Sequence, residues 1–250
     1  MKLARFSYKN KEYFGVVSGD EIIVAKGDMF GEYKLTKKKV PLSSVKLLPP
    51  TEPSKIVAVG LNYKAHTEEF GEEVPDEPRL FLKPASAVIG HNDDIILPAQ
   101  SQRVDYEAEL AIVIGKKCFK VSEDEVGDYI LGFTCLNDVT ARDLQRKDGQ
   151  WTRAKGFDTF APVGPWIETE LKSDSVSISL LLNGEVMQSS NTNMFIFKTR
   201  QLVSYISNVM TLLPGDIITT GTPGGIGPMK SGDVVTVKID GIGELINTVK

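Results

Sequence analysis

The chain of 250 residues has little of what marks several large classes of protein. Its two cysteines, Cys118 and Cys135, are too few for a disulfide framework, so a reduced cytoplasm is the simplest setting and neither thiol is assigned a catalytic role. A formal net charge of −4 leaves no basic stripe, which argues against nucleic acid as a partner. No apolar run approaches membrane-spanning length, and residues 1–10 mix cations with single apolar residues, so neither a membrane span nor a signal peptide is expected. We therefore expect a soluble, cytoplasmic protein.

The length allows one or two domains, and the prolines divide the chain. Residues 1–48 contain three short β-prone segments, at 3–8, 12–17 and 20–25, with a polar turn between the first two. Prolines at positions 41, 49, 50 and 53 then indicate a linker. We predict a small N-terminal β module over residues 1–48, serving packing or dimer contacts without chemistry, and a second domain over residues 54–250.

The second domain has many short strand patterns that do not alternate with helices. Strands are predicted at 55–60, 79–82, 94–97, 107–114, 130–138, 176–183, 216–220 and 233–239. Helices are predicted only at 62–70, 122–128, 140–147 and 198–210, the last with apolar residues at helical spacing. This order argues against a doubly wound sheet. The predicted fold class is α+β and strand-dominated, a mixed β-sandwich or roll with few helices.

Three carboxylates give the main functional signal. Glu107 and Glu109 stand two apart, ahead of the apolar run 110–114, so in a strand they point to the same face. Two like charges held this close repel each other, and burying them unpaired is costly. A hard divalent cation removes the conflict, because Mg²⁺, Mn²⁺ and Ca²⁺ favour carboxylate oxygens. Asp138, flanked by apolar or β-prone residues, is the natural third ligand, and we interpret the three as a metal site.

The plainer interpretation of Glu-x-Glu on a strand is the solvated face of an antiparallel sheet, and on alternation alone it is the commoner case. The neighbouring residues weaken it here. Ala108 is small and residues 110–114 are apolar at every position, so the strand is predicted to be buried on both faces. Such a strand has little room for solvated glutamates.

Further polar residues bear on the chemistry. His66 and Glu69 are three apart and share a face on a helix, where a carboxylate bonded to one imidazole nitrogen raises the basicity of the other. The plain alternative is a surface pair without a role. Arg142 and Gln145 also share a helix face, and an arginine can bind a carboxylate through two parallel hydrogen bonds. Lys155 lies among small and apolar residues, with a solvent-facing lysine at a strand end as its alternative.

Six motifs occur along the chain in a definite order. They are 59–66 (VGLNYKAH) followed by Glu69, 81–87 (FLKPASA), 105–110 (DYEAEL), 137–145 (NDVTARDLQ), 155–160 (KGFDTF) and 221–225 (GTPGG). In this order and spacing the set closely resembles the fumarylacetoacetate hydrolase superfamily. The nearer match is its short prokaryotic branch of acylpyruvate hydrolases and 2-hydroxyhepta-2,4-diene-1,7-dioate isomerases. The resemblance covers about residues 54 to 250, and residues 1–48 resemble the small module that precedes the catalytic domain in many short members.

The resemblance implies the same fold, a homodimer and a role for each matching residue. The implied roles are metal binding of Mg²⁺ or Mn²⁺ by Glu107, Glu109 and Asp138, a catalytic dyad of His66 and Glu69, enolate stabilisation by Lys155, and substrate binding by Arg142, Gln145 and Thr222. Asn62, Lys83 and Asp158 are implied to support these groups; a helix cap, a strand-end cation and a turn residue are their respective alternatives.

One stretch departs from the pattern of the long eukaryotic-type members. Those proteins place a further metal-binding carboxylate shortly before the catalytic histidine, whereas residues 58–61 (AVGL) contain no acid. We therefore predict three protein ligands, with water or substrate completing the metal's shell. The departure also argues against fumarylacetoacetate itself as the substrate.

The predicted substrate is a 2-oxo acid or β-diketo acid, whose carboxylate and keto oxygens can bind a metal together while an enolate forms. The first choice of reaction is hydrolytic C–C cleavage of a 3-acylpyruvate. Two alternatives share the enolate: the dienedioate isomerase of aromatic breakdown, and oxaloacetate decarboxylation or tautomerisation. A non-catalytic protein in which the metal stabilises the fold is the alternative of a different class, and it predicts a closed metal site.

Overall fold

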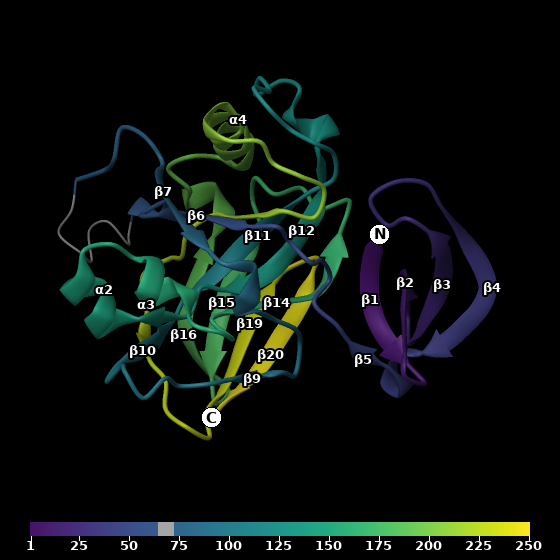
Figure 1. Cartoon of the computed structure of the whole chain (residues 1–250), viewed down its shortest axis with the longest axis horizontal. Coiled ribbons are helices and arrows are strands. Elements are labelled where there is room, and N and C mark those ends of the chain that lie inside the picture. The colour runs from purple at the N-terminus through teal and green to yellow at the C-terminus, as the bar shows by residue number, and fades with distance from the viewer. Residues whose placement is uncertain (65–72) are drawn as a thin grey trace.

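The computed structural model describes residues 1–64 and 73–250, and β-strands dominate both ranges (Figure 1). These ranges contain three α-helices, each at the edge of the sheets. The predicted α+β, strand-dominated class with few helices is confirmed. No helix in the described residues is long and apolar enough to cross a membrane.

The main sheet has twelve strands and joins the N-terminal strands to the rest of the chain. Its hydrogen-bonded order is β4-β3-β2-β1-β14-β12-β11-β17-β6-β7, with β5 paired to β1 and β8 paired to β14. The strands are β1 (Lys2–Tyr8), β2 (Lys11–Ser18), β3 (Glu21–Gly27), β4 (Tyr33–Pro41), β5 (Lys46–Leu47), β6 (Ile56–Gly60), β7 (Arg79–Lys83), β8 (Val88–Ile89), β11 (Ala108–Ile114), β12 (Ile130–Asn137), β14 (Ala161–Glu168) and β17 (Ile217–Thr219).

Two smaller sheets complete the strand layers. A three-stranded sheet has the order β13-β10-β18, and a five-stranded sheet has the order β16-β15-β19-β20-β9. Their strands are β9 (Asp94–Ile95), β10 (Val104–Tyr106), β13 (Thr140–Ala141), β15 (Ser177–Leu182), β16 (Glu185–Asn191), β18 (Gly227–Pro228), β19 (Val234–Ile239) and β20 (Gly243–Val249). The five-stranded sheet packs on the main sheet, where β15 and β19 contact β11 and β12. The largest apolar core fills this interface.

The N-terminal strands form a group of their own on the right of Figure 1. Phe6, Ile22, Val24 and Val40 make a small apolar core between them. The group is attached by hydrogen bonds rather than by packing alone, because β1 pairs antiparallel with β14, placing Leu3 opposite Ile167. The main sheet is thereby continuous from the first strand of the chain to the strands below the candidate site.

The helices match the sequence predictions only in part. The predicted helices at 140–147 and 198–210 appear as α2 (Arg142–Asp148) and α4 (Thr199–Val209), whereas α3 (Thr152–Gly156) was not predicted. The predicted helix at 122–128 is wrong. Only a 3-10 turn forms there, at Val126–Asp128, and Gly127 lies within it, where helix propensity is low. The predicted helix at 62–70 falls mainly on residues outside the described ranges.

Strand β11 lies at the centre of the main sheet and leads directly from the candidate site. All seven of its residues are buried, because β12 and β17 flank it and the five-stranded sheet covers one face. Its apolar run from Leu110 to Ile114 fits a strand with both faces covered. The predicted strand began at residue 107, but Glu107 lies in the short link between β10 and β11.

Candidate active site

The three predicted metal ligands meet because of the register between β11 and β12. These strands pair with Ala108 opposite Asn137, so Glu107 and Glu109 flank one member of the pair and Asp138 follows the other. One oxygen atom of each carboxylate lies within 4.8 Å of the others, and all three side chains are buried. In the residues that the structure describes, this is the one group of acidic, histidine or cysteine side chains close enough to hold a metal ion.

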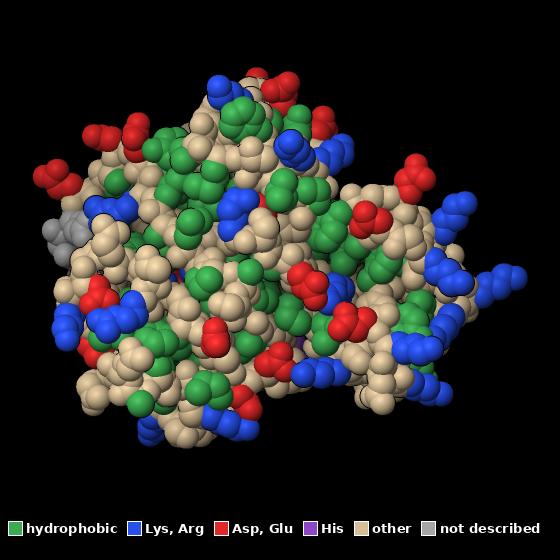
Figure 2. Space-filling model, viewed as in Figure 1, with side chains coloured by type: hydrophobic (Ala, Val, Ile, Leu, Met, Phe, Trp, Pro, Cys, Tyr) green, Lys and Arg blue, Asp and Glu red, His purple; other side chains and the backbone are tan. Residues whose placement is uncertain are grey.

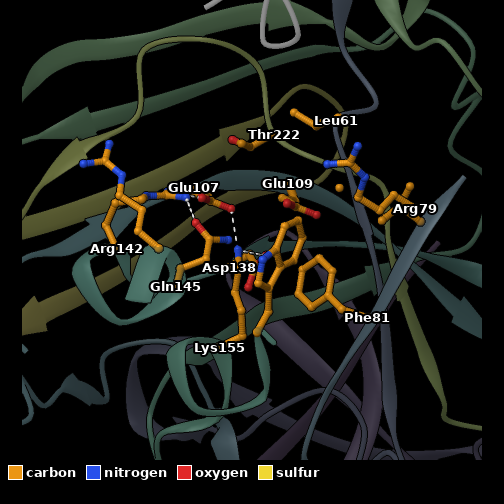
Figure 3. A pocket seen from close by; sticks show the side chains of 14 residues that line it. Leu61, Arg79, Phe81, Glu107, Glu109, Asp138, Arg142, Gln145, Lys155 and Thr222 are labelled. Carbon is orange, nitrogen blue, oxygen red and sulfur yellow. Dashed lines mark hydrogen bonds and ion pairs between the residues drawn. The ribbon is translucent and has the colours of Figure 1, made fainter. Parts of the chain in front are cut away.

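Three buried cations surround the carboxylates, and Figure 3 shows two of them, Lys155 and Arg142. The Lys155 Nζ donates to Glu107 Oε2 at 2.8 Å and to Asp138 Oδ2. The Lys83 Nζ donates to Asp138 Oδ1 at 2.6 Å. The Arg142 Nη2 donates to Glu107 Oε1. Among the described residues, two cations therefore contact Glu107 and two contact Asp138.

The Arg142 guanidinium is fixed in turn by a fourth buried carboxylate. Its Nε donates to Asp105 Oδ2 at 2.9 Å, and the partly exposed Arg103 donates to the other oxygen of Asp105 at the same distance. Among the described residues, four buried carboxylates thus face three fully buried cations. Among the buried side chains of this cluster the carboxylates outnumber the cations by one, and a low-dielectric interior makes an unpaired buried charge costly.

The excess of buried negative charge bears most on the carboxylate of Glu109. This carboxylate accepts a hydrogen bond from the Gly221 amide at 2.8 Å. Burial raises the pKa of Glu109 well above its ordinary value, and the negative charges of Asp138 and Glu107 raise it further. A divalent cation between the three oxygens would oppose all of these effects on the Glu109 pKa.

The two buried lysines differ in how readily they lose a proton. Burial lowers the pKa of Lys155, but the Asp138 and Glu107 carboxylates more than offset it, so the pKa ends above its ordinary value. Burial lowers the pKa of Lys83 as well, and there the charge of Asp138 offsets only part of the effect. Lys155 is therefore the more firmly protonated ammonium of the pair.

The carboxylates lie in a cavity of about 260 Å³ (Figure 3). Its apolar and aromatic wall consists of Val59, Leu61, Phe81 and Trp151, and its further polar lining consists of Arg79, Arg142, Gln145, Arg146, Lys155 and Thr222. The rings of Phe81 and Trp151 contact edge to face, with centroids 5.0 Å apart. A cavity that combines an apolar wall with converging polar and charged groups is typical of sites for small polar molecules.

The glycine-rich loop after β17 closes one side of the cavity. Gly221 has φ +87°, and a Cβ at this position would lie 2.9 Å from the Asn62 Cβ, so a glycine is required. The Asn62 side chain holds the loop by donating to the Thr220 carbonyl at 2.8 Å, and it accepts from the Phe197 amide at 2.7 Å. Thr222 follows directly and lines the cavity.

The structure places most of the predicted site residues together. Lys155 lies on α3 and is 2% exposed, so the alternative of a solvent-facing lysine is wrong. Arg142 and Gln145 lie on α2 and line the cavity, and the Arg142 Nη1 donates to Gln145 Oε1 at 2.7 Å. His66 and Glu69 lie outside the described residues, so their dyad stays a prediction.

The three residues implied to support the site have different outcomes. Lys83 contacts Asp138 directly, and Asn62 holds the loop that carries Thr222. Asp158 is an exposed residue of a turn, as its plainer alternative stated.

Several residues of the site were not found from the sequence. Asp105 precedes the Glu-x-Glu pattern by two residues, and the alternation that singled out Glu107 and Glu109 extends to it. Arg79 begins a strand that was predicted, and Trp151 lies in a segment with no predicted element, but neither was assigned to the site. Gln188, whose side chain contacts the glycine-rich loop, lies on β16, a strand that was not predicted.

The donor set fits a hard divalent cation. Three carboxylate oxygens in one small volume are the ligands that Mg²⁺ and Mn²⁺ prefer, whereas zinc sites of the structural kind use thiolate and imidazole. Residues 58–61 add no fourth carboxylate, and Val59, Gly60 and Leu61 contribute apolar lining. The residues present therefore suit a metal held by three protein ligands and open to the cavity.

Comparison with known proteins points to one family. Residues 55–250 match the family model described as fumarylacetoacetate (FAA) hydrolase C-terminal, and residues 1–50 match a model described as Rv2993c-like, N-terminal. The chain is 44% identical over 222 residues to the rat protein named oxaloacetate tautomerase Fahd2a, mitochondrial, covering 84% of this chain and 71% of the rat protein.

Two solved structures show the same fold over the whole chain. A 2-hydroxyhepta-2,4-diene-1,7-dioate isomerase from Mycobacterium marinum superposes with a TM-score of 0.94 at 44% identity, covering 100% of this chain and 98% of that one. A maleylpyruvate hydrolase from Sphingobium sp. SYK-6, solved with manganese(II) and pyruvate, has a TM-score of 0.84 at 34% identity, again covering 100% and 98% of the two chains. The likeness thus extends to one protein whose structure holds a divalent metal and a 2-oxo acid.

Proposed function

This chain belongs to the fumarylacetoacetate hydrolase family, a family of enzymes, and from that premise we propose that it is a divalent-metal-dependent hydrolase that cleaves a C–C bond in 3-acylpyruvate-type β-diketo acids. The observation that carries the proposal is the convergence of Glu107, Glu109 and Asp138 with the Lys155 ammonium inside one cavity. A divalent cation held by these carboxylates, together with the Lys155 ammonium, would stabilise anionic charge that develops on a substrate oxygen.

Under this proposal Glu107, Glu109 and Asp138 hold Mg²⁺ or Mn²⁺. When bound, the cation supplies Lewis-acid polarisation of the carboxylate and keto oxygens of the substrate. Lys83 and Arg142 keep Asp138 and Glu107 in position through buried hydrogen bonds, and removing either would leave a ligand carboxylate with one cation fewer.

Lys155 faces the charge that appears during the reaction. The Lys155 ammonium is fixed by hydrogen bonds to Glu107 and Asp138, so it is placed to donate to a substrate oxygen that becomes negative. When the C–C bond breaks, its electron pair passes into the enolate of pyruvate, and Lys155 stabilises this anion until a proton reaches carbon. Arg142, Gln145 and Thr222 line the same cavity and are proposed to bind the substrate's carboxylate and carbonyl oxygens.

Hydrolysis also requires a water molecule that attacks the distal carbonyl carbon. We propose His66, oriented by Glu69, as the base that takes the water's proton. The support for this step is the spacing of the two residues and the family pattern they match. The oxygen of water ends in the released carboxylic acid, and pyruvate is the second product.

A second candidate reaction is keto–enol tautomerisation of oxaloacetate, with decarboxylation as its relative. It is favoured by the identity to the rat oxaloacetate tautomerase. It needs enolate stabilisation but no attacking water, so Lys155 would be essential to it and Glu69 much less so. The dienedioate isomerisation named for the Mycobacterium marinum structure would share this requirement.

A non-catalytic protein with a structural metal is less well supported. A structural site is closed by protein ligands. Here the three carboxylates line an open cavity, and the family consists of enzymes.

The test is metal-dependent pyruvate release. Purified protein is incubated with acetylpyruvate and with oxaloacetate, each with Mg²⁺ and with EDTA, while pyruvate formation and the enol absorbance of oxaloacetate are followed. Metal-dependent pyruvate from acetylpyruvate, lost in Glu107→Ala, supports the hydrolase. Reaction of oxaloacetate alone transfers the assignment to the tautomerase or decarboxylase. No reaction with either compound would refute both and favour the isomerase.

We further propose which part of the chain is catalytic, in which compartment the protein acts and in which oligomeric state. Every described residue that lines the cavity lies at or after Val59, which supports residues 54–250 as the catalytic unit and residues 1–48 as an accessory. A cytoplasmic homodimer is proposed on the family pattern. Light scattering coupled to size-exclusion chromatography measures the mass against 27.4 kDa per chain.

A further inference from the structure

One side chain of the edge strand β16 is buried while its neighbours are exposed. Gln188 is 1% exposed, whereas Met187 before it and Ser189 after it face solvent. A buried glutamine on an otherwise exposed edge must satisfy an amide oxygen and two amide hydrogens. Its partners therefore indicate what it does.

The Gln188 amide joins the ligand strand to the loop that carries Thr222. Its Oε1 accepts from the Ala108 amide at 2.9 Å, between the two glutamates that flank Ala108. Its Nε2 donates to Thr222 Oγ1 at 2.9 Å and to the Pro223 carbonyl at 2.8 Å. The loop approaches β16 closely, since a Cβ on Gly225 would lie 2.5 Å from the Met187 carbonyl oxygen.

The gap that Gln188 fills results from the divergence of β17. That strand pairs with β11 only from Ala111 to Val113, so its ladder does not reach Ala108. The loop beyond β17 turns over the cavity instead. Gln188 supplies both the acceptor that the Ala108 amide needs and the hydrogen bonds that hold the loop.

The partners also fix which way the amide points. The Ala108 N–H can only donate, so it must face Oε1, and the Pro223 carbonyl can only accept, so it must face Nε2. The remaining Nε2 hydrogen then obliges Thr222 Oγ1 to accept. A hydroxyl that accepts from this side has its own hydrogen left to donate elsewhere, and Thr222 lines the cavity.

We propose that Gln188 is a positioning residue that makes Thr222 a hydrogen-bond donor to an anionic oxygen of the bound 2-oxo acid. This inference rests on the proposed function. It adds that the cavity recognises an anionic oxygen of the ligand through the hydrogen bond that Thr222 donates. If the amide were replaced by a carboxylate, Thr222 would donate to that carboxylate and turn a lone pair toward the ligand.

The test measures binding rather than turnover. Oxalate, a planar dianion with two adjacent carboxylate groups, is titrated into the Mg²⁺-loaded protein by calorimetry. Gln188→Glu keeps an acceptor for the Ala108 amide and removes the donor to Thr222. We expect oxalate affinity to fall about 10- to 100-fold, the range for losing a hydrogen bond to a charged group. In a Thr222→Val background the same substitution should change affinity by no more than about 2- to 3-fold.

Further variants separate this coupling from charge and from general damage. Ser189→Glu places the same charge on the exposed face of β16 and should leave oxalate affinity unchanged. Gln188→Met removes the donor without adding charge, and Thr222→Ser keeps the hydroxyl, so the first should weaken oxalate binding and the second should retain it. With a substrate from the turnover test, Gln188→Glu should raise KM more than it lowers kcat.

The possible results have distinct meanings. If Gln188→Glu costs the same affinity with and without the Thr222→Val substitution, the inference is overturned while the proposed function stays intact. Failure of the unmutated, Mg²⁺-loaded protein to bind oxalate would overturn the proposed function, and this inference with it. A coupled loss, with Ser189→Glu unaffected, supports both.

Discussion

The N-terminal strands and the candidate site use lysine and carboxylate side chains in opposite ways. Residues 1–50 contain ten lysines and arginines against five acids, and the basic side chains gather on the right of Figure 2, in solvent. Four of the lysines lie on or beside the exposed face of β4, the edge of the main sheet. In the site, Lys83 and Lys155 are almost completely buried against the carboxylates of Glu107 and Asp138.

The contrast shows that the location of a charged side chain, rather than its residue type, decides how much it contributes to stability. Solvated lysines on an edge strand discourage pairing with other chains and add little to stability. In a buried ion pair, the attraction between the two charges roughly offsets the free energy of removing both from water. Removing only the lysine leaves its partner carboxylate buried and unpaired, which destabilises the fold by several kcal/mol. The same substitution should therefore have very different effects at the two ends of the molecule.

The largest expected effect is on turnover. Glu109→Gln keeps the shape of the side chain but removes a charge from the proposed ligand set. Metal-dependent pyruvate release should fall by about 10³-fold or more, which corresponds to the several kcal/mol that a metal contributes to charge stabilisation. The matched change Glu21→Gln, on a half-exposed residue of β3 far from the cavity lining, should leave the rate unchanged. Similar rates for the two variants would contradict the assignment of Glu109.

The next effect is on folding. Lys83→Met removes one of the two cations that fix Asp138, and we expect the free energy of unfolding in EDTA to fall by about 3 kcal/mol or more. Urea denaturation measures it. Lys37→Met, at an exposed position of β4, should change the same quantity by less than about 0.5 kcal/mol. If Lys83→Met and Lys37→Met lowered the free energy of unfolding equally, burial would not decide what a lysine contributes to stability.

Asp216 provides a buried charge away from the cavity and a dependence on pH. Its carboxylate accepts from the Leu213 amide at 2.8 Å, the Ser54 amide at 2.9 Å and the Lys55 ammonium. Although burial by itself raises the pKa of Asp216, these donors more than offset it, and the pKa lies below its ordinary value.

A depressed folded-state pKa stabilises the protein above the ordinary aspartate pKa of about 4, and that contribution is lost as the pH falls through the folded value. Asp216→Asn should cost about 1 to 3 kcal/mol at pH 7 and progressively less below about pH 4. Thermal midpoints of both proteins from pH 7 to pH 3 measure this. A difference that stays constant with pH would argue against the charge as the cause.

The smallest effect is expected for an exposed ion pair. Lys39 Nζ lies 2.9 Å from Glu21 Oε2, and both side chains are about half exposed. Lys39→Gln should change the free energy of unfolding by less than about 1 kcal/mol, and the residual effect should vanish in 1 M salt. A larger, salt-independent loss would indicate that this pair is not simply solvated.

A site residue could be predicted from the sequence when the evidence for it lies in neighbouring residues. Glu107 and Glu109 were found from a spacing of two residues beside a recognisable strand, and Asp138 because the strand that it follows was also recognisable. Lys155 was found through the family pattern, although its helix, α3, was not predicted. The rest depends on contacts between distant segments.

Gln188 is the clearest example of what could not be predicted. It contacts Ala108, 80 residues earlier, from a strand without a regular apolar pattern. No local rule relates the two residues, because only the packing of the five-stranded sheet on the main sheet brings them together. Lys83 likewise has a partner that no local rule identifies, Asp138, which is 55 residues away.

The pairing of β1 with β14 has a consequence for the order in which the protein folds. The first strand of the chain must wait for residues near 167 before it can complete the sheet, and closing so long a loop is entropically slow. The hairpin of β1 and β2, by contrast, involves only neighbouring residues and can form early. We expect the attachment of the N-terminal strands to be a late step on the folding route, and to be among the first contacts that open when the protein unfolds.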